Sequence, residues 1–269
     1  MRAKGKNPSL ESLEPFDSCL TIGRILMPDA SVELTAKTVI KMMDRYLIAE
    51  ALVHEHHARM EYPREDGNRR LLETVRGVPR LHPVWVIEPP RTPGRAAAED
   101  LVAEMLSAGV KAARLPMKQI PPFVWLWDDL CSALEAHAVP AFLDFGAFST
   151  CGSLTDTDVD GVRDLALAHP GLSLILSHVM GGLGVHPGVM HLMRRVDNLF
   201  MDIGGILEFW RVMAHEVGPH RILFATGAPF TDPGILIANI QYMIGFSAEE
   251  KKLMYGDNLR RLLKAVKTA

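Results

Sequence analysis

The sequence contains few cysteines, and their spacing argues against two classes of structure. Its three cysteines are Cys19, Cys131 and Cys151. They are odd in number and form no CxxC pair, so neither a disulfide framework nor a zinc ribbon is indicated. Proteins without disulfide bonds are typical of a reducing compartment. We therefore expect a cytoplasmic location.

Long apolar runs and an excess of positive charge are also missing. No segment approaches the length of a transmembrane helix, and the formal net charge is −3. No basic tract would follow a phosphate backbone, so we expect neither a membrane nor a nucleic-acid partner. The opening stretch "MRAKGKNPSLESLEP" has no apolar segment of signal-peptide type. We predict that residues 1–14 form a loose N-terminal arm.

The sequence is nevertheless apolar enough for a large core, because 48% of its 269 residues are hydrophobic. Segments with helical periodicity separate the apolar runs. "AKTVIKMMDRYL" places Val39, Met42, Met43 and Tyr46 on one face, and "AAAEDLVAEMLSAG" ends at a glycine. "DTDVDGVRDLALAHPG" begins with aspartates suited to helix capping. Eight segments are predicted strands: "FDSCLTIG" (16–23), "IAEALVHE" (48–55), "LHPVWVIE" (81–88), "VKAARLP" (110–116), "VPAFLDFG" (139–146), "LSLILSH" (172–178), "LFMDIGG" (199–205) and "RILFATG" (221–227).

This alternation of strand and helix predicts parallel strands joined by right-handed crossovers. Eight such units in about 250 residues are typical of a (β/α)8 barrel. We therefore predict the α/β class, with a single TIM-like barrel over residues 15–269. An open doubly wound sheet is the alternative, but no GxGxxG or GxxxxGK[ST] motif follows the first predicted strand.

Polar residues gather where the predicted strands end. Side chains alternate along a strand, so Asp17, Cys19 and Thr21 share one face of the first strand. In a barrel, the carboxyl ends of the strands form the functional face. Imidazoles and carboxylates that converge there can hold a divalent metal or exchange a proton. The later strands contribute His54, His56, Arg114, Asp144, His178, Asp202 and Thr226.

Four motifs, in order along the chain, resemble those of a known family. They are "GNRRLLETVRGVPRLHPVWVIEP", "LSLILSHVMGG", "NLFMDIGG" and "HRILFATGAPFTDPG" with the later "EEKKLMYGDNLRRLL". Together they resemble the amidohydrolase superfamily, in the branch of small-molecule hydrolases and of aminocarboxymuconate-semialdehyde and resorcylate-type decarboxylases. The resemblance extends from about residue 15 to residue 265. It implies a barrel fold and an enzyme of the hydrolase or lyase class.

The sequence departs from that family at the metal-binding positions. The resemblance implies a His-x-His pair at the end of the first strand, where this chain has Cys19 and Thr21. The fifth-strand ligand, usually His, corresponds to Asp144, and the eighth-strand aspartate, which also moves the proton of the attacking water, corresponds to Gly227. Only His178 keeps the family's residue. The usual binuclear metal centre is therefore not expected.

Three interpretations of this altered site remain open. In the first, an enzyme works without metal: Asp144 or Asp17 acts as base, Arg114 binds a substrate carboxylate, and His178 or His56 moves protons. In the second, a zinc ion has moved to a new ligand set: His54, His56 and His178, with Asp144 or Cys19. In the third, the barrel has lost catalysis and serves as a binding or assembly subunit.

We expect a hydrolase that acts on an amide, lactone or related bond of a small carbonyl or carboxylate substrate, without the usual metal. The alternative functions are a decarboxylase or other lyase, and a non-catalytic barrel. We expect no cofactor, and a single zinc ion is the alternative. A homodimer is left open. Cys19 beside a histidine would suit a covalent nucleophile, although buried cysteines are usually inert packing. The predicted catalytic residues are Asp144, His178 and His56. The predicted substrate-binding residues are Arg114, Cys19, Thr21, Asp202 and Thr226, and the candidate metal ligands are His54, His56 and His178.

Overall fold

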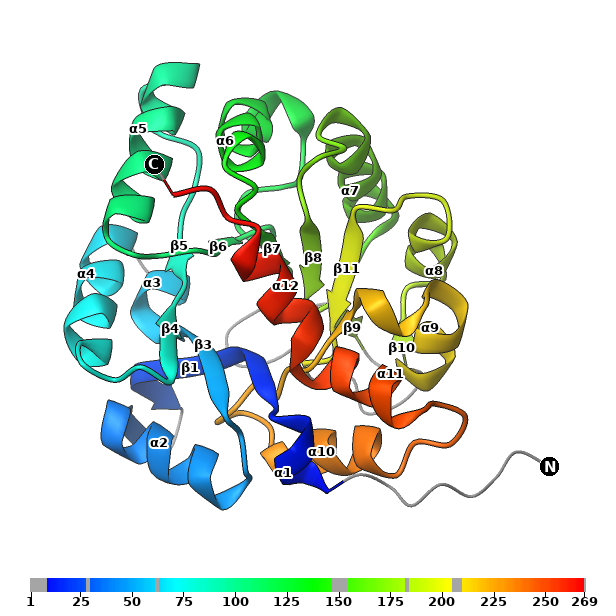
Figure 1. The fold of residues 1–269 in the computed structure, drawn as a ribbon. Helices are drawn as coiled ribbons and strands as arrows, with labels where there is room; N and C mark the ends of the chain where they lie inside the picture. Colours follow the sequence, from blue (N-terminus) through cyan, green and yellow to red (C-terminus); the bar gives the residue numbers. More distant parts are fainter. Residues whose placement is uncertain are drawn as a thin grey trace.

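The computed structural model describes residues 9–27, 30–60, 63–146, 154–181, 184–204 and 210–268 (Figure 1). The strands are β1 (Phe16–Met27), β2 (Ala30–Leu34), β3 (Glu50–Glu55), β4 (Leu81–Pro83), β5 (Trp85–Val86), β6 (Ala113–Leu115), β7 (Ala141–Asp144), β8 (Leu174–Ser177), β9 (Met180–Gly181), β10 (Gly184–Val185), β11 (Leu199–Asp202) and β12 (Ile222–Leu223). The α-helices are α1 (Leu10–Leu13), α2 (Ala36–Arg45), α3 (His56–Met60), α4 (Arg64–Val75), α5 (Arg95–Ser107), α6 (Val124–Ala136), α7 (Asp156–Ala168), α8 (Pro187–Met193), α9 (Trp210–Val217), α10 (Pro233–Gln241), α11 (Ala248–Lys252) and α12 (Asn258–Lys264). A 3₁₀ turn at Pro219–Arg221 and a π-helical turn at Leu253–Asp257 complete the described elements.

The predicted α/β class is confirmed, and the strands that alternate with helices pair in parallel. They form one sheet in the order β12-β11-β8-β7-β6-β5 and a second in the order β2-β1-β3-β4. Hydrogen bonds cross both seams between the sheets. Only Val84 separates β4 from β5, and its N–H donates to the carbonyl of Val53 at 2.9 Å. At the other seam, Leu20 of β1 forms a parallel bridge with Ala228, which follows β12.

An apolar layer fills the interior of this ring of strands at its amino end. Each strand of the ring contributes one residue to this layer, either from the strand itself or from a position directly beside it. These residues are Phe16, Leu52, Val84, Ala112, Phe142, Ile175, Phe200 and Leu223. Leu259 and Leu262 of α12 pack against these residues. Figure 1 shows α12, in red, crossing the strands. The amino end of the strands is therefore closed by apolar packing, as expected of a TIM-type interior that is a packed core rather than a pore.

The helices follow the predicted periodicity, with one difference in capping. Val39 and Met43 of α2 are buried, and Met42 and Tyr46 pack at the edge of the core. For α7, the cap is Thr155 rather than an aspartate of the predicted helix start: its hydroxyl accepts a hydrogen bond from the N–H of Asp158, whose carboxylate bonds back to the N–H of Thr155. This reciprocal pair satisfies two backbone donors that the helix itself leaves unpaired.

Several boundaries differ from the sequence-based expectation. Strand β1 continues to Met27 and forms an antiparallel hairpin with β2. The eighth strand is short, because regular pairing ends at Leu223. The predicted loose arm included residues that are ordered, because Leu10–Leu13 form α1 and Leu13 is buried. Residues 1–8 lie outside the described residues, as does Gly205 of the predicted seventh strand. Within the described part of the chain, no helix has the length and apolar character needed to cross a membrane.

Candidate active site

A polar layer lies next to the apolar layer, on the side of the carboxyl ends of the strands. In five strands, the residue two positions after the apolar one is polar. His54, Arg114, Asp144, Ser177 and Asp202 stand at these positions, and each is at most 3% exposed. Because side chains alternate with a period of two, they point into the same interior as the apolar layer. The predicted gathering of polar groups toward the carboxyl ends of the strands thus holds for Arg114, Asp144 and Asp202.

Asp144, at the end of β7, is the centre of this layer. Its Oδ2 accepts hydrogen bonds from Nε of Arg59 at 2.7 Å and from Nη1 of Arg114 at 3.1 Å. Its Oδ1 accepts from the N–H of Gly146 at 2.9 Å and lies 3.1 Å from Nδ1 of His178. Burial alone would raise the pKa of this carboxyl, but the positive charges of Arg59, His178 and Arg114 hold it well below its usual range. Asp144 is therefore ionised and a poor proton acceptor at neutral pH.

His178 connects Asp144 to the sulfur of Cys19. Its backbone is left-handed, with φ at 55°, a conformation that histidine adopts more readily than most residues. While Nδ1 faces Asp144, Nε2 lies 3.6 Å from Sγ of Cys19. Burial alone would lower the pKa of the imidazole, but negative charge on Cys19 and Asp144 outweighs it and raises the pKa to about 9. His178 is therefore a proton donor at neutral pH.

Arg114 contacts the described residues of the polar layer through one of its nitrogens. Nη1 donates to Asp144 and, at 3.1 Å, to Oγ of Ser177. Among the described residues, Nε and Nη2 have no hydrogen-bond partner, although Arg114 is only 1% exposed. These two nitrogens form the planar fork with which arginine binds a carboxylate bidentately. Burial lowers the pKa of Arg114, but the charges of Cys19 and Asp144 more than reverse this and raise it.

Two further buried carboxylates, Asp17 and Asp202, accept hydrogen bonds from residues of the site. Asp17 accepts hydrogen bonds from the N–H groups of Cys19 and Thr226, both at 3.0 Å, and from the hydroxyl of Thr226 at 2.5 Å. Burial raises the pKa of Asp17 to about 7 despite these bonds. Asp202 accepts from Oγ of Ser177 at 2.5 Å, and burial raises its pKa too. Asp17, Asp202 and Thr226 thus contact and hold other side chains, and their predicted roles as base or in substrate binding stay predictions.

The histidines of "HEHH" do not lie together as predicted. His54 ends the inward face of β3, where Nε2 contacts the Thr21 hydroxyl at 3.2 Å. Burial, together with the positive charges of Arg114 and Arg59, lowers the pKa of His54 well below its usual range, so it is neutral. The expectation that His54 and His56 point together on one strand is wrong, because β3 ends at Glu55 and His56 begins α3. A proton-transfer role for His56 stays a prediction.

Sequence reasoning missed Arg59 and Ser177. Arg59 lies in α3 and reaches Asp144 from outside the strands, so no strand periodicity could identify it. Gly146 makes the approach possible, because a Cβ at that position would come within 1.9 Å of Nη2 of Arg59. Ser177 stands directly before His178 in the "SH" dipeptide, and its parity along β8 would have placed it beside Asp202.

The family resemblance implies a metal site at these positions, and the described residues do not fit one. Two guanidinium groups already pair with Asp144, the hydroxyl of Thr21 contacts His54, and Gly227 offers no side chain. Across the described ranges, no group of three or more His, Cys, Asp or Glu side chains is arranged to hold a metal ion. The cations around Asp144 are protein side chains.

The comparisons with known proteins agree with this fold. The chain matches the family model described as amidohydrolase over residues 34–265. It is similar to the solved structure of a dihydroxybenzoic acid decarboxylase from a Polaromonas species with bound manganese and an inhibitor, 2-nitroresorcinol (TM-score 0.68, 15% identity, 93% of this chain and 96% of that chain). It is also similar to a 5-carboxyvanillate decarboxylase from Sphingomonas paucimobilis (TM-score 0.68, 12% identity, 95% and 100%) and to a putative amidohydrolase from Staphylococcus aureus (TM-score 0.67, 15% identity, 93% and 99%). A comparison with curated proteins found no match. At these identities, the solved structures show a shared fold.

Proposed function

The chain belongs to the amidohydrolase family, and we propose that it is a metal-independent hydrolase that cleaves an amide, lactone or related bond of a small, carboxylate-bearing substrate. The observation that carries this proposal is the contact between His178 and Asp144, at 3.1 Å. A histidine held by a buried carboxylate is a common proton-transfer unit in enzymes. Here the unit stands where the family resemblance implies metal ligands.

In this proposal, His178 is the catalytic residue and Asp144 a positioning residue. The imidazolium donates the proton from Nε2 to the leaving nitrogen or oxygen of the substrate, and then accepts a proton during hydrolysis. Asp144 keeps Nδ1 in place and stabilises the charged ring, as the acid does in other histidine-based hydrolases. The two arginines keep Asp144 ionised, so it does not compete for the proton.

Arg114 is proposed to bind the substrate. Its Nε and Nη2 are buried and have no partner among the described residues, and buried donors of this kind are costly unless something accepts their hydrogen bonds. A planar anionic group such as a carboxylate matches the fork in shape and charge. This is the reason for expecting an anionic substrate.

Decarboxylation is the second candidate function. The raised pKa of His178 favours it, since replacing a carboxylate by hydrogen needs a proton donor. Two of the similar solved structures are decarboxylases by name, although they share no more than 15% identity with this chain. Against it, a carboxylate held in an arginine fork is stabilised more as substrate than in a transition state that loses its charge. We therefore rank hydrolysis first.

Product analysis tests the proposal. We expect a screen of lactones, amides and aromatic carboxylates, read by mass spectrometry, to show addition of water to at least one lactone or amide. Release of carbon dioxide instead would support the second candidate, and no turnover at all would favour a non-catalytic barrel. Dialysis against a chelator should leave turnover unchanged, whereas one zinc per chain in elemental analysis would contradict metal independence.

A pair of histidine variants tests the assignment of the catalytic residue. His178→Ala should lower kcat by about two to four powers of ten, the usual loss for a general acid–base group. His191→Ala is the matched control, because His191 lies exposed in α8. Full activity in His178→Ala would remove the assignment and leave the fold untouched.

A further inference from the structure

Cys19, His178 and Asp144 form a continuous chain of contacts. Sγ of Cys19 lies 3.6 Å from Nε2 of His178, and Nδ1 of the same ring lies 3.1 Å from Oδ1 of Asp144. A nucleophile, a base and a group that orients the base, in this order, are the arrangement found in cysteine and serine hydrolases. Cys19 lies within β1, Asp144 ends β7 and His178 follows β8, so no local sequence pattern places them together.

The backbone of Cys19 is held firmly in this arrangement. Its N–H donates to Oδ1 of Asp17 at 3.0 Å, and its carbonyl accepts from the N–H of Gly227 at 3.0 Å. A reacting atom carried by a fixed strand keeps its geometry better than one carried by a free loop. Cys19 is 1% exposed and the side chain of His178 9%, so both groups lie inside the ring of strands.

A second buried cysteine shows what an inert thiol looks like in this protein. Cys131 lies in α6, is fully buried in the apolar core and has Asp128 and Glu135 as its charged neighbours. Burial, with these two negative charges, raises the pKa of its thiol to about 12. Cys19 instead has the imidazole of His178 3.6 Å from its sulfur. A histidine in contact with the sulfur is the usual companion of a nucleophilic cysteine.

Arg114 supplies an independent sign that a ligand binds beside this sulfur. Its Nη1 donates to Asp144, the carboxylate that His178 also contacts, and its Nε and Nη2 are buried without a partner among the described residues. A substrate carboxylate in this fork would hold a small molecule in the same cluster of side chains as Cys19 and His178. Holding a reactant beside the attacking atom is itself a large part of catalysis.

We infer that Cys19 is the nucleophile of this site, acting with His178 as acid–base partner and Asp144 as positioning residue. The inference rests on the proposed hydrolytic function and deepens it, because it replaces direct attack by water with a covalent intermediate. The substrate class is then an acyl compound with a small anionic group.

The reaction balances in two steps. The thiolate of Cys19 attacks the carbonyl carbon and forms a C–S bond, the C–N or C–O bond to the leaving group breaks, and His178 gives the leaving group its proton from Nε2. Water then attacks the thioester, His178 accepts a proton from it, and the C–S bond breaks to release the carboxylic acid and the thiolate. Acyl compound and water give acid and amine or alcohol, and Cys19 and His178 are returned to the states in which they began.

The first experiment uses p-nitrophenyl acetate as the probe, with an acid quench, intact-mass measurement and peptide mapping. We expect one acetyl group per chain, on Cys19, in the wild-type protein. His178→Ala should acetylate at least about tenfold more slowly, since it loses the acid–base partner in contact with the sulfur. Cys131→Ala is the matched control and should acetylate like the wild type. Cys19→Ser and Cys19→Ala, checked for wild-type thermal unfolding, should carry no acetyl group at the quench.

Iodoacetamide gives a second measurement that needs no acyl transfer. Cys19 should be alkylated at neutral pH well before Cys131, and His178→Ala should slow this reaction as well. Lack of reaction of Cys19 with both probes, or equal labelling of Cys19 and Cys131, would overturn the inference.

The outcomes separate this inference from the proposed function. If Cys19→Ala hydrolyses a lactone or amide at the wild-type rate, the hydrolase stands and the nucleophile is wrong. If Cys19 forms the acetyl-enzyme while every screened substrate loses carbon dioxide and none gains water, the reactive cysteine stands and the hydrolase does not.

Discussion

The two ends of the barrel each contain arginine–carboxylate pairs, but in opposite surroundings. At the carboxyl end, Arg114 and Asp144 are 1% and 3% exposed in their side chains. At the amino end, Arg260 of α12 pairs with Glu50 at 2.9 Å, and these side chains are 29% and 31% exposed. Solvent-exposed pairs contribute little to stability, whereas buried pairs cost desolvation that their attraction seldom exceeds. This difference is expected if the buried cluster serves the proposed chemistry rather than stability.

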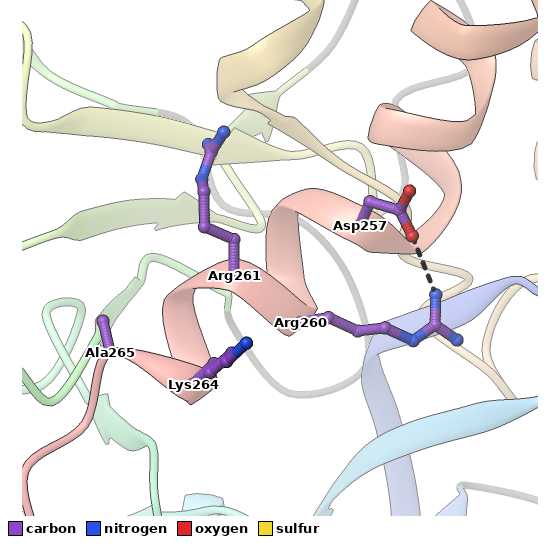
Figure 2. Close-up of a pocket in the computed structure, with 5 residues that line it drawn as sticks. All are labelled: Asp257, Arg260, Arg261, Lys264 and Ala265. Atoms are coloured by element: carbon purple, nitrogen blue, oxygen red, sulfur yellow. Dashed lines mark hydrogen bonds and ion pairs between the residues drawn. The ribbon is translucent and has the colours of Figure 1, made fainter.

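Figure 2 shows the amino end in detail. Asp257, Arg260, Arg261, Lys264 and Ala265 of the C-terminal segment line a cavity of about 490 Å³. Its one marked ion pair joins Asp257 and Arg260, three residues apart, at 3.4 Å. Neighbouring charges on one helix are a common surface feature. Neither a histidine nor a cysteine is among the residues that line this cavity, in contrast to the cluster at the other end.

The largest expected effect comes from removing the charge at the centre of the carboxyl end. Asp144→Asn removes the charge of a buried carboxylate that pairs with Arg59 and Arg114, so the free energy of unfolding should fall by about 3 to 5 kcal/mol. Turnover should fall by about two to four powers of ten, because His178 loses its orienting partner. Urea denaturation and kcat measure the two effects. Glu50→Gln at the amino end is the control; equal losses in both variants would erase the distinction between the ends.

Opposite pH dependences are expected at the two ends. Burial raises the pKa of Asp17 from 3.8 to about 7, so the folded protein keeps a proton that the unfolded chain has released. This contribution is complete below the unfolded pKa and is lost as pH rises toward 7. Between about pH 4 and pH 7, this carboxyl should make the free energy of unfolding fall by up to about 1.4 kcal/mol per pH unit. The Asp17→Asn variant should lack this fall.

Glu50 should show the reverse sign. Its hydrogen bond with His82, with further help from Arg260, lowers its pKa despite partial burial. Its contribution is present above the unfolded pKa and is lost as pH falls. Urea denaturation of Glu50→Gln across the same pH range should thus show a shallower loss at acid pH. Slopes of the same sign for both variants would contradict the assignment.

A smaller effect is expected from Arg114→Lys, which keeps the positive charge but removes the planar fork. We expect KM for an anionic substrate to rise by about tenfold with a lesser change in kcat, since the fork binds substrate rather than the reacting atoms. Steady-state kinetics on a substrate found in the screen measures this. An unchanged KM would mean that Nε and Nη2 do not contact the substrate.

The smallest effect is expected at the amino end. Arg260→Ala removes a partly exposed ion pair with Glu50 and a cation–π contact with Phe16 at 5.4 Å. We expect a loss of about 1 kcal/mol in the free energy of unfolding and no change in kcat. A clear loss of turnover in this variant would show that the two ends are coupled.

The sequence alone determined the strand–helix alternation and the parity of the strands. Period-two alternation brought Arg114, Asp144 and Asp202 to the interior. It does not hold through β1, where Phe16 lies in the interior layer and the pairing shifts register between Asp17 and Leu20. These features are local, because they depend only on which residues follow one another. They were enough to predict the barrel class and most residues of the polar layer.

Tertiary structure decided the partners. Cys19 and His178 are 159 residues apart in the chain, and only the closing of the strands into a ring brings sulfur and imidazole together. Arg59 reaches Asp144 from a helix, outside any strand pattern, and His56 belongs to the same helix because β3 ends at Glu55. The protonation of His178 and Asp144 likewise follows from burial and from charges contributed by other strands. Electrostatic interactions act through space and depend on burial, so a linear sequence cannot reveal them until the fold has set the distances.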